Sequence, residues 1–264
     1  MLLKIENLDV SFRGEDGDVT RAAIDVNLTL DRGEVLGIVG ESGSGKSSVA
    51  MSIPRLLPSP PAFWPKGRIL FDGRDTLSLP LDELQKIRGG RIGVVFQDPM
   101  GSLSPLHRIG DQLIETVKLH RAISQSAARD LALEWLGKVG ISDPQARANA
   151  YPHELSGGMQ QRVMIAMGLM LDPDLFIADE PTTALDVTIQ AQVLKLMQKL
   201  RRASSAVLLI THDLGVVSQM ATRIAVMKGG RVVETSDHPH EFFNQPKHPY
   251  SQALVCEARR MELE

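Results

Sequence analysis

Eight residues near the N-terminus have the types and the spacing needed to hold a phosphate group. They occupy positions 40–47 and fit the pattern G-x-x-x-x-G-K-[ST], in which glycines let backbone N–H groups turn towards an anion. The ammonium group of Lys46 can reach the terminal phosphates of a nucleoside triphosphate, and the Ser47 hydroxyl can bind Mg²⁺. The predicted nucleotide-binding residues are Gly40, Glu41, Ser42, Gly43, Ser44, Gly45, Lys46, Ser47 and Ser48.

The segments on either side of this loop support that interpretation. An apolar run at 35–39 predicts a strand, and residues 48–53 predict a helix that ends near Ile53 because Pro54 follows. The free N–H groups and the positive dipole end of such a helix would face the same anion. A Gly/Ser-rich surface turn is the alternative, and the strand–loop–helix order argues against it.

Polar side chains follow three further apolar strands. Asp179 and Glu180 follow one, His212 follows a second and Gln97 follows a third. Ligands bind at the carboxyl ends of parallel strands, so these side chains are expected to lie near the phosphates of the same nucleotide. We predict that Asp179, Ser47 and Gln97 bind Mg²⁺, that Glu180 acts as the general base, and that His212 and Gln97 position water. An exposed acidic pair and a structural histidine are the alternatives.

A second potential anion site precedes a helical run at 163–171. It reads Leu-Ser-Gly-Gly-Met-Gln-Gln-Arg over residues 155–162, and Ser-Gly-Gly before a helix can bind an anion. Two such sites in one chain make sense if the second serves a nucleotide held by another subunit. The residues predicted to complete the partner's site are Ser156, Gly157, Gly158 and Gln160.

The overall composition sets limits on the function. The chain has 264 residues, a formal net charge of −3 and one cysteine, Cys256. The charge gives no broad field for attracting nucleic acid, and no internal disulfide can form. The apolar runs fall well short of the roughly 20 residues of a membrane-spanning helix, so if the protein works at a membrane, another chain must hold it there.

The remaining elements predict an α/β protein with an open, mostly parallel sheet. A turn separates two strands that precede the phosphate-binding loop, so a small antiparallel β-layer is expected there, and the proline-rich segment 58–65 is expected to be a loop. The predicted strands are 2–12, 19–30, 35–39, 67–71, 91–96, 175–178, 206–210, 224–227 and 231–234. The predicted helical regions are 48–53, 81–88, 109–139, 189–201 and 214–221.

These motifs, taken in order, resemble the ATP-binding subunit of an ABC transporter over nearly the whole chain. They are the Walker A loop at 40–47, the Q-loop at Gln97, the signature at 155–161, the Walker B strand before Glu180, the D-loop with Asp186, and the switch His212. The resemblance implies a P-loop NTPase (RecA-like) core at 1–100 and 172–240 in a single ATPase domain. It also implies an inserted α-helical subdomain at 101–171 and a short C-terminal tail at 241–264 with a His-Pro-Tyr motif. Two such subunits would meet head to tail around ATP and Mg²⁺.

Within that family the chain is similar to D-type subunits of the dipeptide, oligopeptide and nickel import branch. The segments that carry this likeness are 96–105, 178–187 and 248–250. The resemblance implies two transmembrane permeases, a different F-type ATPase subunit, an extracytoplasmic substrate-binding protein, no nucleic acid, and a peripheral place on the cytoplasmic face of a bacterial inner membrane. Peptides are the expected substrate, and nickel or metal chelates are the alternative.

Two features depart from the family pattern. Many D-type subunits continue further and carry a cysteine cluster, whereas this chain has only Cys256, so no iron–sulfur cluster is expected. The family often stacks an aromatic residue on adenine, and here the candidates are Phe12 and Arg21. ABC ATPases of DNA repair or translation are the alternative class, although they usually have long coiled coils or two cassettes in one chain. A P-loop kinase would not explain the Leu-Ser-Gly-Gly stretch.

Overall fold

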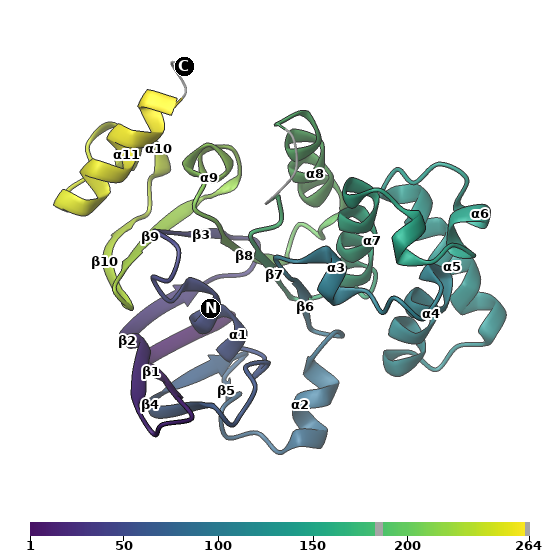
Figure 1. Cartoon of the computed structure of the whole chain (residues 1–264), viewed down its shortest axis with the longest axis horizontal. Coiled ribbons are helices and arrows are strands. Elements are labelled where there is room, and N and C mark those ends of the chain that lie inside the picture. Colours follow the sequence, from purple (N-terminus) through teal and green to yellow (C-terminus); the bar gives the residue numbers. More distant parts are fainter. Residues whose placement is uncertain (183–186, 262–264) are drawn as a thin grey trace. The chain divides into compact units, whose positions relative to one another are not determined.

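A computed structural model describes residues 1–182 and 187–261 of the chain (Figure 1). The chain forms two compact units. The first unit combines Met1–Leu84 with Ala206–Glu264, and the second unit is Gln85–Ser205. None of the helices within the described ranges is both long and apolar enough to cross a membrane.

The first unit begins with an antiparallel sheet in the order β2-β1-β4-β5. Its strands are β1 (Leu3–Arg13), β2 (Val19–Leu30), β4 (Ala62–Phe71) and β5 (Arg74–Asp75). Leu3 of β1 faces Leu30 of β2 on one side and Phe71 of β4 on the other, and all three are buried. The predicted antiparallel β-layer is therefore confirmed, and it gains two strands from the chain after the phosphate-binding loop.

The proline-rich segment 58–65 corrects one prediction, because strand β4 already begins at Ala62 and includes Pro65. Among the described residues, β5 pairs with β4 only at Leu70 and Phe71, so the first half of β4 is a sheet edge on that side. A proline has no N–H to donate and is tolerated on such an edge. The prolines of this segment therefore do not prevent a strand.

A second group of strands in the first unit is mostly parallel. Strand β3 (Val35–Val39) pairs in parallel with β8 (Ala206–Ile210) and β9 (Arg223–Lys228), and β10 (Arg231–Ser236) pairs antiparallel with β9. All five residues of β3 are buried. Helix α9 (Leu214–Met220) packs so closely that a Cβ added to Gly37 would lie 2.9 Å from a Val217 methyl group. The predicted parallel arrangement of the strand before the loop with the strands at 206–210 and 224–227 is confirmed.

The other helices of this unit are α1 (Lys46–Ser52), α10 (Pro239–Asn244) and α11 (Pro249–Met261), and α2 (Leu81–Ile87) leads into the second unit. Helix α1 ends at Ser52, as Pro54 predicts. The segment 241–264, predicted as a short C-terminal tail, contains α11 and most of α10 (Figure 1). A proline is tolerated in the first helical turn, where its missing N–H costs nothing, and Pro239 and Pro249 both stand there.

The second unit contains two parallel strands and a group of helices. Its elements are β6 (Ile92–Val95), α3 (Pro99–Ser102), α4 (Ile109–His120), α5 (Gln125–Lys138), α6 (Pro144–Ala148), the 3₁₀ helix η1 (Pro152–Glu154), α7 (Gly157–Leu169), β7 (Leu175–Asp179) and α8 (Val187–Leu200). The helical run predicted at 109–139 is divided, because the Ser124 side chain accepts a hydrogen bond from the Ala127 N–H and caps α5.

Helix α7 packs directly on the two strands of its unit. A Cβ added to Gly93 of β6 would lie 2.0 Å from the Gly168 carbonyl oxygen, and one added to Gly168 would lie 2.8 Å from the Phe176 ring of β7. No side chain would fit at either position. Strand β6 and helix α7 thus touch through their backbones, and the Phe176 ring of β7 packs on the α7 backbone at Gly168.

Candidate functional site

The phosphate-binding loop of the first unit is held in its shape by backbone contacts that only glycine permits. Gly40 and Gly45 have φ angles of +151° and +96°. A Cβ added to Gly40 would lie 2.1 Å from the Met227 carbonyl oxygen, and one added to Gly45 would lie 2.1 Å from that of Ala22. The Gly230 N–H also donates to the Ser44 carbonyl at 3.1 Å. The loop is thus fixed against the backbones of β2 and β9.

Lys46 lies over this loop. Lys46 is only 5% exposed, and its Nζ donates to the carbonyl oxygens of Gly40 at 2.7 Å and Glu41 at 2.8 Å. At Gly43 an added Cβ would meet no atom within 4 Å, so the loop is open there. A buried ammonium group, the Ser47 hydroxyl and glycine-rich backbone amides form a donor set that fits a polyphosphate with its Mg²⁺.

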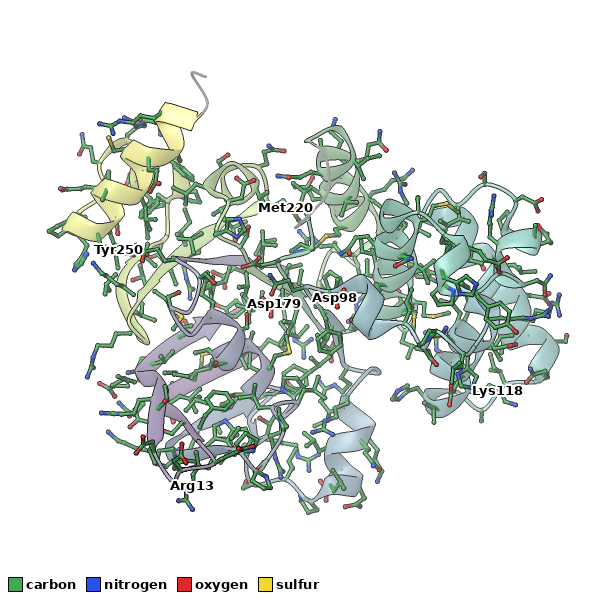
Figure 2. All side chains as sticks on the ribbon, viewed as in Figure 1. Arg13, Asp98, Lys118, Asp179, Met220 and Tyr250 are labelled. Carbon is green, nitrogen blue, oxygen red and sulfur yellow. The ribbon has the colours of Figure 1, made fainter. Side chains whose placement is uncertain are left out.

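Tyr250 is a contact of this loop that the sequence did not reveal. Its hydroxyl accepts a hydrogen bond from the Glu41 N–H at 2.9 Å, although the two residues are far apart in the chain. Tyr250 stands in the first turn of α11, and Figure 2 labels it there. The His-Pro-Tyr motif drew attention to this position, but nothing in the motif indicates a partner.

The turn after β8 presents His212. Asp213 caps helix α9 by accepting hydrogen bonds from the N–H groups of Gly215 and Val216, and its own N–H donates to the Thr211 hydroxyl. These bonds fix the residues on both sides of His212, whose side chain is exposed. The predicted switch histidine therefore stands on a well-defined turn at the end of a buried strand.

The two candidates for stacking on adenine lie on neighbouring strands of the antiparallel sheet. Phe12 of β1 faces Thr20 of β2 and is half-buried. Arg21 of β2 is half exposed, and its guanidinium group forms an ion pair with Asp9 at 3.0 Å. The guanidinium group of Arg21 thus already has a carboxylate partner, whereas Phe12 offers an uncharged, half-buried ring.

In the second unit, the ends of β6 and β7 bring two predicted residues together. The Gln97 amide nitrogen donates to a Glu180 carboxylate oxygen at 3.0 Å. Asp179 is the last residue of β7, is 5% exposed and is labelled in Figure 2. Glu180 has a φ angle of +46°, a conformation that is uncommon for residues other than glycine and that recurs at functional sites.

The signature segment is organised around Ser156 and Gln160. The Ser156 hydroxyl accepts from the Met159 N–H at 3.4 Å and caps helix α7. Gln160 is only 5% exposed, and its amide nitrogen donates to the carbonyl oxygens of Pro152 and Leu155. Gln160 therefore turns inward and holds the segment that presents Ser156, whereas an added Cβ at Gly157 would meet no atom within 4 Å.

Arg162 connects the signature helix to its neighbours and was not singled out from the sequence. Its guanidinium group donates to the Val139 carbonyl at 2.9 Å and to the Gln192 side-chain oxygen at 2.7 Å. Val139 follows α5, and Gln192 lies on α8. A single side chain on α7 thus fixes the helix that begins at the signature to two other helices of its unit.

The structure does not test the predictions for the D-loop and for the iron–sulfur cluster. The D-loop residue Asp186 lies outside the described residues. Across residues 1–182 and 187–261, no group of three or more His, Cys, Asp or Glu side chains could hold a metal ion. The expectation that the chain has no iron–sulfur cluster stays a prediction.

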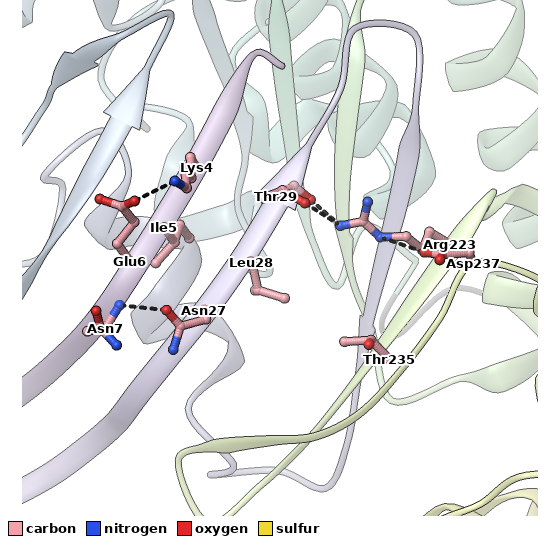
Figure 3. Close-up of a pocket in the computed structure, with 10 residues that line it drawn as sticks. All are labelled: Lys4, Ile5, Glu6, Asn7, Asn27, Leu28, Thr29, Arg223, Thr235 and Asp237. Atoms are coloured by element: carbon pink, nitrogen blue, oxygen red, sulfur yellow. Dashed lines mark hydrogen bonds and ion pairs between the residues drawn. The ribbon is translucent and has the colours of Figure 1, made fainter.

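A groove of about 640 Å³ in the first unit is separate from the predicted site residues (Figure 3). Arg223 crosses it, donating to the Thr29 carbonyl and pairing with Asp237 at 3.7 Å (Figure 3). Lys4, on the opposite wall, forms an ion pair with Glu6. The charged groups of this groove neutralise one another, so it has no excess of positive charge with which to hold a phosphate.

The chain is similar in sequence and in fold to known ATP-binding proteins. Residues 24–183 match the family model described as "ABC transporter". The oligopeptide transport ATP-binding protein OppD of Bacillus subtilis is 49% identical, over 99% of this chain and 73% of that protein. The dipeptide transport ATP-binding protein DppD of the same organism is 48% identical, over 99% of this chain and 78% of its own length. A solved ATP-binding cassette dimer in a post-hydrolysis state with ADP and Pi has a TM-score of 0.79 and 33% identity, covering 89% of this chain and 98% of the solved chain.

Proposed function

The chain belongs to the ABC transporter family, and on that premise we propose that it energises an importer of dipeptides or oligopeptides. As a member of this family it is an ATPase with a P-loop NTPase fold. The observation that carries the proposal is the near 50% identity to transport ATP-binding proteins for oligopeptides and dipeptides across almost the whole chain. A peptide substrate is favoured over nickel because the names of these relatives specify peptides.

In the first unit, we assign phosphate binding to residues 40–48. Lys46 would bind the terminal phosphates, since its ammonium group lies on the open glycine-rich loop. The Ser47 hydroxyl would be a ligand of Mg²⁺. His212 would position water or a phosphate oxygen from its fixed turn after β8. Phe12 is the preferred partner of adenine, because the guanidinium group of Arg21 is engaged by Asp9.

In the second unit, we assign the activation of water to Glu180. Its hydrogen bond with Gln97 holds the carboxylate in one orientation, which supports a role as general base. Asp179 and Gln97 would contribute to the Mg²⁺ ligands, which is chemistry that oxygen donors suit. Mg²⁺, when bound, would neutralise charge on the phosphates during transfer.

Ser156, Gly157 and Gly158 are proposed to complete the nucleotide site of a second ATPase subunit, as is Asp186 of the D-loop. The cap that Ser156 forms on α7 and the open space beside Gly157 support this assignment. Gln160 would act indirectly, because its buried amide holds the backbone before Ser156. The partner subunit would be a related F-type ATPase.

The complete importer would contain two transmembrane permeases and an extracytoplasmic substrate-binding protein in addition to the two ATPases. This chain would then sit on the cytoplasmic face of the bacterial inner membrane, held there by the permeases. It needs no nucleic acid in this role. The peptide relatives support the permeases and the substrate together.

A reconstituted complex in lipid vesicles tests the proposed function. The chain, its F-type partner, both permeases and the binding protein should take up a labelled tripeptide only when Mg·ATP is supplied on the cytoplasmic side. A complex with the Lys46→Ala chain is the matched control and should lose most uptake. Transport of a nickel chelate without transport of peptides would overturn the assignment of the substrate.

A further inference from the structure

One peptide group of the phosphate-binding loop is held at both ends. The Glu41 N–H donates to the Tyr250 hydroxyl at 2.9 Å, and the Gly40 carbonyl accepts from the Lys46 Nζ at 2.7 Å. This N–H and this carbonyl belong to the same peptide group, which is planar and rigid. The orientation that the tyrosine hydroxyl gives to the N–H therefore also fixes the direction of the carbonyl that holds the lysine.

The Tyr250 ring is itself well anchored. Tyr250 is 7% exposed and belongs to a hydrophobic cluster that includes Val39, the last residue of β3 before the loop. The Lys228 ammonium group lies 4.5 Å from the centre of the ring, within the range of a cation–π contact. Packing thus sets the position of the ring, and the hydroxyl is left to bond to the loop.

The backbone that leads into Tyr250 is anchored by Glu234 of β10. The N–H groups of Lys247 and His248 donate to the two carboxylate oxygens of Glu234 at 2.9 and 2.8 Å. The Tyr250 N–H in turn donates to the His248 Nδ1 at 3.1 Å. Burial raises the pKa of Tyr250, so its hydroxyl stays protonated and neutral at physiological pH.

We propose that Tyr250 is a positioning residue for the ATPase reaction, whose hydroxyl orients the Gly40–Glu41 peptide and thereby places the Lys46 ammonium group. Tyr250 does not touch the nucleotide in this proposal and acts only through the loop. The inference deepens the proposed function and rests on the assignment of residues 40–48 to phosphate binding. It gives the C-terminal helix α11 a direct part in nucleotide affinity.

The test is Tyr250→Phe in the full chain, which removes the hydroxyl and keeps the ring. The dissociation constant for Mg·ATP should rise about two- to tenfold, the range expected for one hydrogen bond. The melting temperature without nucleotide should fall by no more than about 5 °C, because one hydrogen bond is lost while the ring packing is retained. Hydrogen exchange at the Glu41 amide should become faster. An unchanged dissociation constant in the folded variant would overturn the proposal.

Val255→Ala is the matched control, because Val255 packs in the same cluster without contacting the loop through a polar group. It should lower the melting temperature and leave the dissociation constant for Mg·ATP unchanged. A weakening of binding in Val255→Ala equal to that of Tyr250→Phe would show that any loss of packing suffices, which would also overturn the proposal.

Glu234→Gln provides a second route if Tyr250→Phe fails to fold. A glutamine side chain has one acceptor oxygen where the carboxylate has two, so one of the two N–H groups before Tyr250 loses its partner. Binding of Mg·ATP should weaken in the same direction, and the effects of the two variants should be less than additive. Failure of the wild-type chain to bind Mg·ATP would instead contradict the proposed function, which separates the two outcomes.

Discussion

The Gln97 amide nitrogen donates to the Glu180 carboxylate at 3.0 Å, which joins the ends of two parallel strands, β6 and β7. The side chains are 83 residues apart in sequence and meet because parallel strands end at the same edge of a sheet. The bond orients the carboxylate oxygen that is proposed to receive a proton from water. Both residues can therefore be tested by substitutions that keep their shape.

We expect Glu180→Gln to lower the rate of ATP hydrolysis by about 100-fold or more, because an amide cannot accept the proton from water. Binding of Mg·ATP should be retained, since the phosphate-binding loop is unaltered. The rate is measured by phosphate release in the complete complex with an F-type partner that carries the equivalent substitution, so that only this site limits turnover. Hydrolysis at the wild-type rate would remove Glu180 from the role of general base.

Gln97→Glu should change the pH dependence of the rate. The substitution places a second carboxyl group about 3 Å from Glu180, and two like charges at that distance disfavour ionisation of one of them. The pKa of the pair rises, so the acid limb of the pH–rate profile should move to higher pH. Gln97→Ala is the control, because it removes the hydrogen bond without adding charge. Equal profiles for the two variants would contradict this explanation.

Gly45→Ala and Gly43→Ala should differ strongly in their effect on folding. Both glycines have positive φ angles, +96° and +77°, so each substitution costs about 1 kcal/mol or more of backbone strain. At Gly45 the added methyl group would also lie 2.1 Å from the Ala22 carbonyl oxygen, whereas at Gly43 it would meet nothing. Gly45→Ala should therefore lose about 3 kcal/mol or more of stability.

The measurement for the glycine pair is the free energy of unfolding in urea without nucleotide. Gly43→Ala serves as the matched control for positive-φ strain alone. Equal losses in the two variants would mean that the loop moves freely away from Ala22, contrary to the close contact seen here.

The stability that the ionised Glu234 carboxylate gives to the first unit should be lost in acid. Burial of its carboxylate opposes ionisation, but the donors around it, the Ser251 hydroxyl and the N–H groups of Lys247 and His248, outweigh this and lower the pKa of Glu234 below its ordinary value of 4.5. A group with a lowered pKa contributes stability that is complete above the ordinary value and is lost as the pH falls through the folded value. The advantage of wild type over Glu234→Gln should be constant from pH 7 to about 5 and should shrink below about 4.5.

This prediction is checked by urea unfolding of both proteins at a series of pH values. Glu15→Gln, on an exposed turn between β1 and β2, is the control and should show no such convergence with wild type. A difference between wild type and Glu234→Gln that grows towards acid pH would contradict the lowered pKa.

The elements on which the chemistry rests could be predicted from sequence because each has a local cause. The buried run before Gly40, the proline after Ile53 and the strand ending at Asp179 all depend on neighbours within a few positions. The inward turn of Gln160 and the hydrogen bond between Tyr250 and Glu41 depend on segments that meet only after folding. Pro65 in β4 escaped prediction for the same reason, because its tolerance comes from the sheet edge on which it lies.

The backbone contact between Gly93 and Gly168 has a mechanical consequence. Side chains between two elements can change rotamer and absorb a small displacement, but here the carbonyl of α7 meets the Cα of β6 with nothing between them. We therefore expect the helix that begins at Ser156 and the strand that ends before Gln97 to shift together. A displacement of the signature end of α7 is therefore expected to shift β6 and the Gln97 that follows it.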